Sequence, residues 1–280
     1  MRSVKPAIPV APYIGGKSKL AKIIIEQIES IPHTTYAEAF VGMGGVFLRR
    51  PNAPKCEIIN DYSKDVANLF RVLQVHYVAF LEHIRWKLSS RSEFDRLMSV
   101  NPDTLTDIER AARFLYIQKL AFGGKVKGHN FGLVYDAPAR WDNNKIASIL
   151  EGVYERLSGV IIESLEYKEF IKRYDREGTL FYLDPPYYGN EKDYGLNMFG
   201  REEFMLIATT LKEIKGKFIM SLNDVPKVRQ IFAGFNLYPV KTTYTIRGNG
   251  TAKPVGELLI TNLKLKGLTA LKPSIKKPLK

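Results

Sequence analysis

Short apolar segments typical of β-strands alternate with helical patterns along most of the chain, and this alternation constrains the fold more than any other feature. We expect strands at 36–40, 56–60, 160–164, 179–183, 217–222 and 257–263, and helices at 18–29, 44–50, 64–73, 167–173, 201–214 and 226–231. Strands that alternate with helices predict an α/β fold with a doubly wound, mostly parallel sheet. Ligands of such sheets bind beyond the carboxyl ends of the strands, so motifs at those ends are candidate sites.

The interval 75–155 breaks this alternation. It contains a helical pattern at 110–120 and then a glycine-rich, basic stretch at 122–131, without an evident strand of the main sheet. We therefore predict an α/β domain formed by 1–74 and 156–263, an inserted and mainly helical lobe at 75–155, and a basic tail at 264–280. A chain of 280 residues is long enough for one domain with an insertion.

The charge balance is strongly basic, with 42 Lys and Arg against 29 Asp and Glu and a net charge of +13. Six of the positive charges lie in the last 17 residues, but the rest of the chain is basic as well. A basic chain favours a polyanionic partner, with nucleic acid first and an acidic membrane surface second. No signal peptide and no apolar stretch of about 18 residues is evident, so we expect a cytoplasmic protein.

The sequence offers little for a disulfide or a metal site. Cys56 is the single cysteine, which excludes an internal disulfide and a thiolate zinc cluster. The four histidines lack tight metal-ligand spacing. We therefore expect chemistry that needs no metal.

A rigid turn follows the strand expected at 179–183, where the sequence reads Asp184, Pro185, Pro186 and Tyr187. Proline fixes φ, removes a hydrogen-bond donor and keeps the residue before it extended. The turn would present a carboxylate, a backbone carbonyl and an aromatic ring to one small volume. Such groups suit a flat heterocycle with an exocyclic amino group; the alternative is a surface turn with a solvated acid.

A second motif is a glycine-rich turn between an expected strand and a helix, with Gly42 and Gly44 in the turn. Glycines allow a tight turn and let a ligand approach the backbone amides. Asp61 follows Gly42 by 19 residues and ends the next strand, where an acid would accept hydrogen bonds from ribose hydroxyls. The dinucleotide pattern G-x-G-x-x-G is incomplete because Phe47 occupies its last place. The turn therefore favours an adenosine cofactor without a pyrophosphate, a condition that S-adenosylmethionine meets.

Together these motifs resemble those of the Dam-type DNA adenine-N6 methyltransferases, in which the cofactor motif precedes the inserted lobe and the D-P-P-Y motif follows it. The resemblance covers nearly the whole chain. It includes the glycine-lysine motif at 12–17, the E-P-F-x-G motif at 38–42, the ribose-binding acid at 60–61, the start of the lobe at 114–116 and 122–124, and the late strands at 217–224 and 256–262. It implies a Rossmann-like methyltransferase sheet with a DNA-recognition lobe.

The resemblance also implies which residues bind the cofactor. Two departures concern this set: Ala39 replaces the usual proline, and Glu166-Tyr167 stand where an Asp-Phe pair is usual. Glutamate can accept the same hydrogen bond and tyrosine can stack, so cofactor binding should survive. The expected S-adenosylmethionine site comprises Tyr13, Gly15, Gly16, Lys17, Glu38, Phe40, Gly42, Gly44, Gly45, Asp61, Glu166, Tyr167 and Asp184.

The chemistry implied by the resemblance is a direct displacement at adenine N6, whose lone pair is delocalised into the ring. The Asp184 carboxylate and the Pro185 carbonyl would accept the two amino hydrogens and favour a pyramidal nitrogen. Tyr187 would stack on the base, which must be flipped out of the duplex. Proximity and electrostatics would supply the rate without a covalent intermediate.

Two basic, glycine-rich regions are candidates for DNA contact, one in the lobe and one between late strands. The second could also be an ordinary hairpin turn. Lysine more often positions DNA than reads it, whereas Asn130 could pair with an adenine. The lobe lacks the Arg-Tyr-Asn run of GATC-reading relatives, so no recognition sequence is predicted. The expected DNA contacts are Lys125, Lys127, His129, Asn130, Arg247, Asn249 and Lys253.

These observations predict a sequence-specific DNA methyltransferase that modifies adenine N6 in double-stranded DNA. We expect it to act as a monomer and to function in DNA adenine methylation or in restriction–modification. The same turn could act on cytosine N4, RNA or a protein amide. A catalytically inactive DNA-binding protein is a different class of alternative, and a dinucleotide oxidoreductase is a more distant one. A restriction partner is left open.

Overall fold

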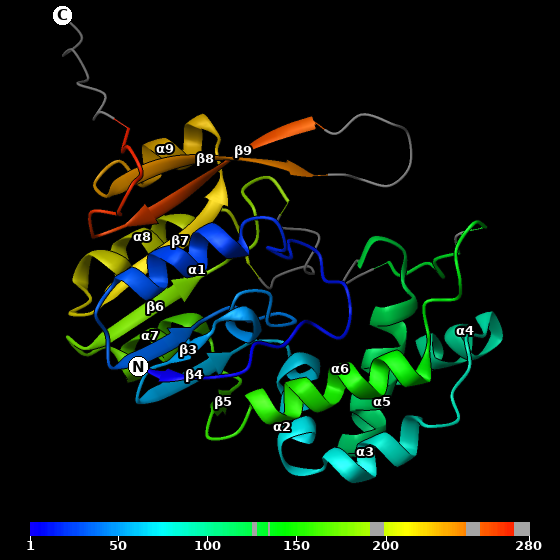
Figure 1. Ribbon diagram of the computed structural model, residues 1–280. Coiled ribbons are helices and arrows are strands. Elements are labelled where there is room, and N and C mark those ends of the chain that lie inside the picture. The colour runs from blue at the N-terminus through cyan, green and yellow to red at the C-terminus, as the bar shows by residue number, and fades with distance from the viewer. Residues whose placement is uncertain (125–127, 134, 191–198, 245–252, 272–280) are drawn as a thin grey trace, which may run out of the picture.

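The computed structural model describes residues 1–124, 128–133, 135–190, 199–244 and 253–271 (Figure 1). Its main sheet has seven strands in the order β5-β4-β2-β6-β7-β9-β8. The first five of these are parallel to one another, whereas β9 runs antiparallel to both β7 and β8. The strands are β2 (Thr35–Glu38), β4 (Cys56–Asn60), β5 (Ile161–Glu163), β6 (Thr179–Leu183), β7 (Lys217–Asn223), β8 (Asn236–Tyr244) and β9 (Lys253–Thr261). The predicted α/β fold with a mostly parallel sheet is confirmed.

The order of the strands reverses between β2 and β6. The chain runs from β2 outward through β4 to β5, and then returns to place β6 on the other side of β2 and β7 beyond it. The carboxyl ends of β2 and β6 therefore meet at the switch point of the sheet, where doubly wound folds bind their ligands.

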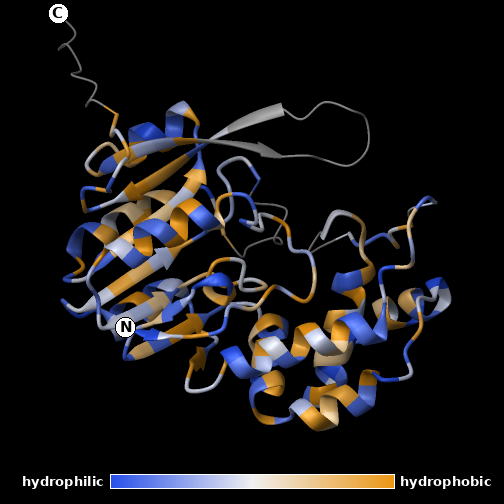
Figure 2. Ribbon diagram, viewed as in Figure 1, coloured by the Kyte–Doolittle hydropathy of each residue, from blue (hydrophilic) through white to orange (hydrophobic). Residues whose placement is uncertain are grey.

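Helices cover both faces of this sheet. One face packs on α7 (Tyr167–Tyr174), α8 (Glu203–Glu213) and α9 (Pro226–Ile231), and the other on α1 (Ala21–Ser30). Two buried hydrophobic clusters result, one on each side of the strands. Figure 2 shows the strands as largely hydrophobic, while the helices carry both kinds of residue.

The remaining helices gather beside the carboxyl-end side of the sheet (Figure 1). They are α2 (Lys64–Val75), α3 (Tyr77–Ile84), α4 (Arg91–Ser99), α5 (Asp107–Leu120) and α6 (Asn143–Arg156), with short 3-10 turns at η2 (Pro102–Thr104) and η3 (Phe122–Gly124). The described part of 75–155 holds no strand beyond an isolated bridge between Ala121 and Phe131. α2 packs against α5, and both contribute to the core cluster on the α1 face. The domain boundaries remain a prediction.

Several element boundaries differ from the sequence prediction, and the expected helix at 44–50 is wrong. Gly44 has φ of +75°, a left-handed conformation that a helix excludes, and a 3-10 turn, η1 (Phe47–Arg49), follows it instead. α1 begins at Ala21, so Lys17 precedes the helix. The prediction also missed β8, which contains Pro239; proline is tolerated there because β8 is an edge strand. A two-stranded sheet of β1 (Arg2–Ser3) and β3 (Asn52–Ala53) was likewise not anticipated.

The segment expected to be a basic tail begins as packed chain. Leu265 is buried, and the Leu271 N–H donates a hydrogen bond to the Leu237 carbonyl. The Lys266 N–H also donates to Oε1 of Gln27 on α1. Residues 264–271 therefore belong to the folded structure, and 272–280 lie outside the described residues.

Candidate active site

A pocket of about 460 Å³ lies at the switch point, with walls from the segment after β2 and the turn after β6. Most of the predicted cofactor residues line it. They are Tyr13, Gly15, Gly16, Lys17, Glu38, Phe40, Gly42, Gly45, Asp61 and Asp184. The structure thus brings together residues from four separate motifs, whose cofactor roles remain a prediction.

Strand alternation explains why polar side chains converge there. Leu180 and Tyr182 of β6 belong to the core cluster on the α1 face, whereas Phe181 and Leu183 belong to the opposite cluster. The side chain two residues beyond Tyr182 is therefore expected on the α1 face. Asp184 occupies that position, and this explains why its side chain contacts residues on the α1 face.

Asp184 is held by two donors on one carboxylate oxygen. Lys17 Nζ lies 2.7 Å from Oδ1, and Ser221 Oγ on β7 donates to the same oxygen at 3.0 Å. The Lys17 side chain is 2% exposed and that of Asp184 is 18% exposed. Burial raises the pKa of Asp184, and the nearby Lys17 ammonium opposes this rise.

The rest of the turn is fastened to the neighbouring strands. The Tyr187 hydroxyl accepts a hydrogen bond from Lys17 Nζ at 3.0 Å and donates one to Glu257 on β9. The Asn223 side chain at the end of β7 accepts from the Tyr188 N–H and donates to the Tyr188 carbonyl, each at 2.9 Å. The turn is consequently a fixed platform.

The glycine turn and Asp61 form the opposite wall. The Asp61 carboxylate accepts hydrogen bonds from the Gly42 and Ser63 backbone amides, both at 2.9 Å. Gly42 has φ of +51°, and a Cβ at this position would lie 3.0 Å from the Tyr13 ring. Burial raises the pKa of Asp61 to about 6, while the two amides oppose this rise. Both the conformation and the close approach thus require glycine at 42.

Glu38, the last residue of β2, lines the floor of the pocket. Its carboxyl is buried and accepts a hydrogen bond from the Tyr36 hydroxyl at 2.6 Å. Burial raises the pKa of Glu38 to about 8, although the hydrogen bond from Tyr36 lowers it. The carboxyl is therefore mostly protonated at neutral pH.

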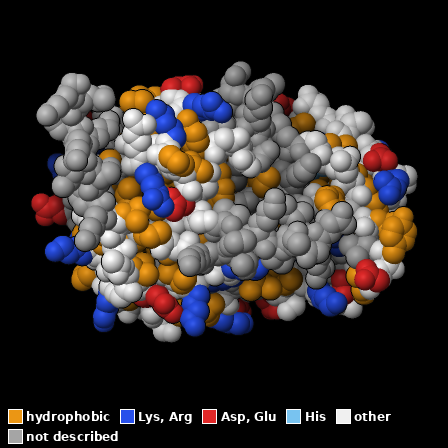
Figure 3. Space-filling model, turned by 90° about the horizontal axis from the view of Figure 1, so that it is seen from above, with side chains coloured by type: hydrophobic (Ala, Val, Ile, Leu, Met, Phe, Trp, Pro, Cys, Tyr) orange, Lys and Arg blue, Asp and Glu red, His pale blue; other side chains and the backbone are white. Residues whose placement is uncertain are grey.

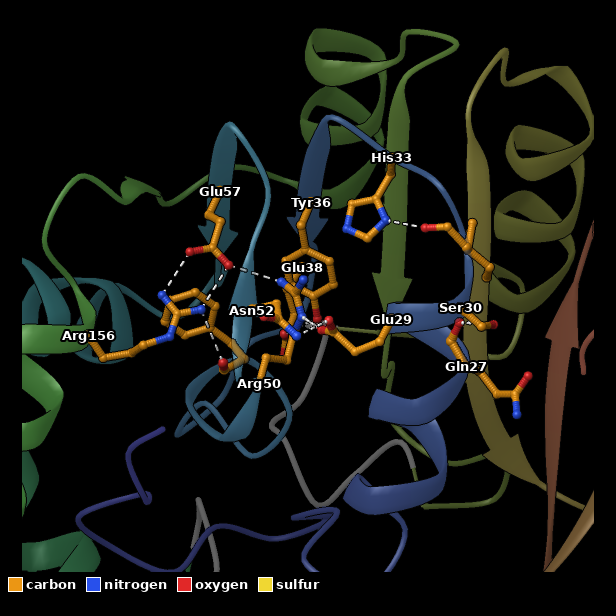
Figure 4. A network of polar contacts seen from close by, with 12 residues as sticks. Gln27, Glu29, Ser30, His33, Tyr36, Glu38, Arg50, Asn52, Glu57 and Arg156 are labelled. Carbon is orange, nitrogen blue, oxygen red and sulfur yellow. Dashed lines mark hydrogen bonds and ion pairs between the residues drawn. The ribbon is translucent and has the colours of Figure 1, made fainter. Parts of the chain in front are cut away.

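Behind Glu38 lies a network of buried charges at the amino ends of β2 and β4 (Figure 4). Glu57 accepts from Arg50 Nη1 at 3.0 Å and from both terminal nitrogens of Arg156 at 2.8 Å. Arg50 also pairs with Glu29 on α1 and stacks over the Tyr36 ring at 4.0 Å. Since Arg156 ends α6, this network ties the helical region to the sheet.

Some predicted residues have other partners. Glu166 caps α7 by accepting hydrogen bonds from the Lys168 and Glu169 amides, and it does not line the pocket. Tyr167 packs behind the wall against Phe40 and donates to Glu203 at 2.6 Å. Gly44, Pro185 and Tyr187 likewise border the pocket without lining it.

The structure describes only some of the residues that were predicted to contact DNA. Lys125, Lys127, Arg247 and Asn249 lie outside the described residues, as does the side chain of Lys253. Asn130 is exposed beside η3, where its carbonyl accepts a hydrogen bond from the Phe122 N–H, and His129 is half-buried next to it. Figure 3 shows Lys and Arg side chains spread over the described part of one face and mixed with Asp and Glu. The DNA contacts remain a prediction.

The sequence analysis did not assign a role to Ser221, Asn223 or Glu257, although all three hold the turn. A signal was present, because each is a polar residue in an otherwise apolar strand. Lys119 of α5 and Phe199 also line the pocket without having been predicted. Lys119 Nζ donates to the Val10 carbonyl at 2.7 Å, and burial lowers its pKa.

Within the described ranges, groups of three or more His, Cys, Asp or Glu side chains placed to hold a metal ion are absent. In the same part of the chain, every helix is too short or too polar to cross a membrane.

The fold is that of an α/β protein with a pocket at the switch point of a doubly wound sheet, where such folds bind their ligands. The chain belongs to the D12 class of N6 adenine-specific DNA methyltransferases, because the family profile matches residues 13–246. The predicted family, the enzyme class and the methylation of adenine in DNA are thereby confirmed, and a methyl donor is implied.

Relatives match over most of the chain at low identity. A type II methyltransferase, M.CviBI, of Paramecium bursaria Chlorella virus NC1A is 24% identical and covers 81% of this chain and 87% of its own. M1.LlaDCHI of Lactococcus lactis subsp. cremoris, also a type II methyltransferase, is 25% identical over 91% of this chain and 95% of its own. A DNA adenine methylase of Vibrio cholerae is 25% identical over 88% of this chain and 93% of its own.

Proposed function

We propose that the enzyme transfers a methyl group from S-adenosylmethionine to N6 of an adenine flipped out of double-stranded DNA, acting as a monomer. The observation that carries this proposal is the position of Asp184, at the rim of the switch-point pocket and with one carboxylate oxygen fixed by Lys17 and Ser221.

The pocket suits S-adenosylmethionine in several respects. The Asp61 carboxylate is oriented by two backbone amides and can accept hydrogen bonds from a ribose. Phe40 and Phe199 line the same cavity and offer apolar surface to an adenine ring. When bound, S-adenosylmethionine supplies an electrophilic methyl group on a sulfonium centre. The protein's part is to bind this donor and to exclude water.

Asp184 and Pro185 would orient the target amine. Both described contacts of the Asp184 carboxylate fall on Oδ1, so we assign Oδ2 to one amino hydrogen of adenine and the Pro185 carbonyl to the other. Two acceptors on one amine favour a pyramidal nitrogen whose lone pair points into the pocket. Preorganised acceptors of this kind need no rearrangement during the reaction.

Asp184 also suits the removal of the proton. Burial raises its pKa above that of a solvated aspartate, which makes it a better transient acceptor than its ordinary value would allow. Water can then take the proton after transfer. The side chain therefore both positions the amine and receives its proton.

Duplex DNA is the substrate that the charge favours. The net charge of +13 supports binding to a polyanion whose affinity falls with salt. An adenine inside a duplex must leave the stack to reach Asp184, and we assign Tyr187 to stack on it. Its hydroxyl is held by Lys17 and Glu257, which fixes the ring in place.

The test is to incubate the protein with S-adenosylmethionine labelled on its methyl group and with unmethylated duplex DNA, and then to identify the labelled nucleoside. We expect N6-methyladenine. Label on N4-methylcytosine would overturn the assigned base, and label on single-stranded DNA alone would overturn the duplex substrate. A light-scattering mass of the active protein tests the monomer.

A further inference from the structure

Glu257 lies at an unusual place for an acidic residue. It is fully buried on β9, directly before the apolar run Leu258, Leu259 and Ile260. β9 pairs with β7 so that Glu257 is opposite Asn223, which clamps the Tyr188 backbone. Buried carboxylates are costly unless they are paired or hydrogen-bonded. A carboxylate retained at this position therefore indicates a specific task.

The hydrogen bond of Glu257 connects it, through two further side chains, to the Asp184 carboxylate. Glu257 Oε1 accepts a hydrogen bond from the Tyr187 hydroxyl, and that hydroxyl accepts one from Lys17 Nζ at 3.0 Å. Lys17 Nζ in turn lies 2.7 Å from Asp184 Oδ1 and donates to the Gly15 carbonyl at 3.1 Å. Four side chains thus connect the middle of β9 to the carboxylate at the pocket.

The direction of these hydrogen bonds matters because a tyrosine hydroxyl has a single proton. When that proton is donated to Glu257, a lone pair of the hydroxyl faces the Lys17 ammonium. Without the Glu257 carboxylate the hydroxyl could turn and present its proton toward Lys17, which would repel the ammonium. Glu257 thereby determines whether Tyr187 attracts Lys17 to its observed position.

We propose that Glu257 is a positioning residue for methyl transfer: through the Tyr187 hydroxyl it holds Lys17 against Asp184 Oδ1 and so leaves Oδ2 for the adenine amine. This inference rests on the proposed function. Lys17 Nζ also lies over the Tyr187 ring, 4.6 Å from its centroid, so both the ring and the hydroxyl contact the lysine, and Glu257 acts on the hydroxyl.

A double-mutant cycle on the full chain tests the proposal, using Glu257→Gln, Tyr187→Phe and the double variant. Both changes keep the size of the side chain, and Tyr187→Phe keeps the aromatic ring. Loss of a hydrogen bond to a charged group corresponds to a drop of roughly tenfold in the single-turnover methylation rate. Glu257→Gln removes the charge but keeps an acceptor oxygen, whereas Tyr187→Phe removes the hydroxyl itself. Because both changes act on the same hydrogen bond, the double variant should fall no further than Tyr187→Phe alone, about tenfold, rather than the roughly hundredfold that independent sites would give.

Binding measurements distinguish a positioning role of Glu257 from a merely structural one. The KM for DNA and the dissociation constant for S-adenosylmethionine should stay within about twofold of wild type, since the interaction acts on the chemical step. The matched control pair is Glu163→Gln and Tyr174→Phe, a similar tyrosine–glutamate hydrogen bond between β5 and α7 that does not line the pocket. These control variants should leave the methylation rate unchanged.

Each other outcome has a defined meaning. Single variants with wild-type rates, multiplicative losses in the double variant, or losses confined to KM would overturn the role of Glu257. If Glu257→Gln does not fold, Tyr187→Phe alone still decides, because a wild-type rate in that variant excludes any action through the hydroxyl. A wild-type enzyme that forms no N6-methyladenine would instead refute the proposed function.

Discussion

Two clusters of buried charge lie on the same face of the sheet, one at each end of the strands, and they differ in what their carboxylates still offer. At the amino ends, both oxygens of Glu57 are taken by Arg50 and Arg156, and the carboxylate is 4% exposed. At the carboxyl ends, the described contacts of Asp184 converge on Oδ1, and its side chain is 18% exposed beside a pocket.

We interpret the Glu57 cluster as a structural ion cluster and the Asp184 cluster as the proposed catalytic one. A carboxylate enclosed by two guanidinium groups has no capacity left for a ligand, and it fixes α6 to the sheet. A carboxylate bound on one oxygen is equally well oriented but can still accept a hydrogen bond. Ion pairing by itself therefore does not identify a candidate active site; what distinguishes Asp184 is that its described contacts leave Oδ2 available beside the pocket.

The largest expected effect is on chemistry at the open cluster. Asp184→Ala should lower the single-turnover methylation rate by roughly 10³-fold, because it removes the acceptor that orients the amine. Because Asp184 also belongs to the expected cofactor site, binding of S-adenosylmethionine, followed by calorimetry, should weaken by much less than the rate at saturating cofactor. Asp184→Asn is the matched variant, since it keeps the shape and loses the charge. An Asp184→Ala enzyme with full activity would contradict the mechanism.

The next largest effect is on stability at the closed cluster. Glu57→Gln should lower the free energy of unfolding by about 3–5 kcal/mol, because the buried Arg156 guanidinium loses its carboxylate partner and Arg50 retains only Glu29. Urea denaturation measures this change. The methylation rate per folded molecule should stay near that of wild type. A large loss of rate without a loss of stability would show that the two clusters do not divide the tasks in this way.

A third prediction concerns pH and Glu38, which lies between the clusters. Its pKa is about 8 in the folded protein against 4.5 ordinarily, so between these pH values the folded state binds more protons than the unfolded state. The stability contributed by this raised pKa is therefore lost as the pH rises. Relative to Glu38→Gln, wild type should lose up to about 1.4 kcal/mol of unfolding free energy per pH unit over that window.

Asp61→Asn provides the comparison for the pH experiment. The pKa of Asp61 is raised only to about 6 from 3.8, so its effect should be confined to that lower and narrower window. Chemical denaturation at a series of pH values measures both variants. Parallel stability profiles for wild type and Glu38→Gln would show that Glu38 does not keep its proton in the folded state.

The smallest effect is expected where an ion pair is largely exposed to solvent. Glu82 on α3 and Arg85, which follows that helix, pair at 3.3 Å, and their side chains are 64% and 57% exposed. Glu82→Gln should change the free energy of unfolding by less than about 0.5 kcal/mol, because solvent screens such pairs. Urea denaturation beside Glu57→Gln gives a direct comparison. A similar loss in both variants would mean that burial does not distinguish them.

Local patterns in the sequence predicted the sheet and much of the pocket. The rigid turn at Asp184 and the glycine turn at Gly42 each depend on neighbouring residues, and both were recognisable. The pairing of Lys17 with Asp184 was not, because it joins positions far apart in the chain. Tyr187 and Glu257 are likewise 70 residues apart. The helix expected at 44–50 failed because apolar periodicity does not reveal the left-handed backbone at Gly44.

The parallel pairing of β2 with β6 has a consequence for the order of assembly. Thr35 pairs with Thr179, so the two walls of the pocket come from parts of the chain that are separated by the whole helical region. Contacts between distant segments form late, since a long loop must close first. A nascent or truncated chain that ends before β6 lacks Asp184 and one pocket wall, and it cannot modify DNA. Activity thus begins only when both halves of the sheet have joined.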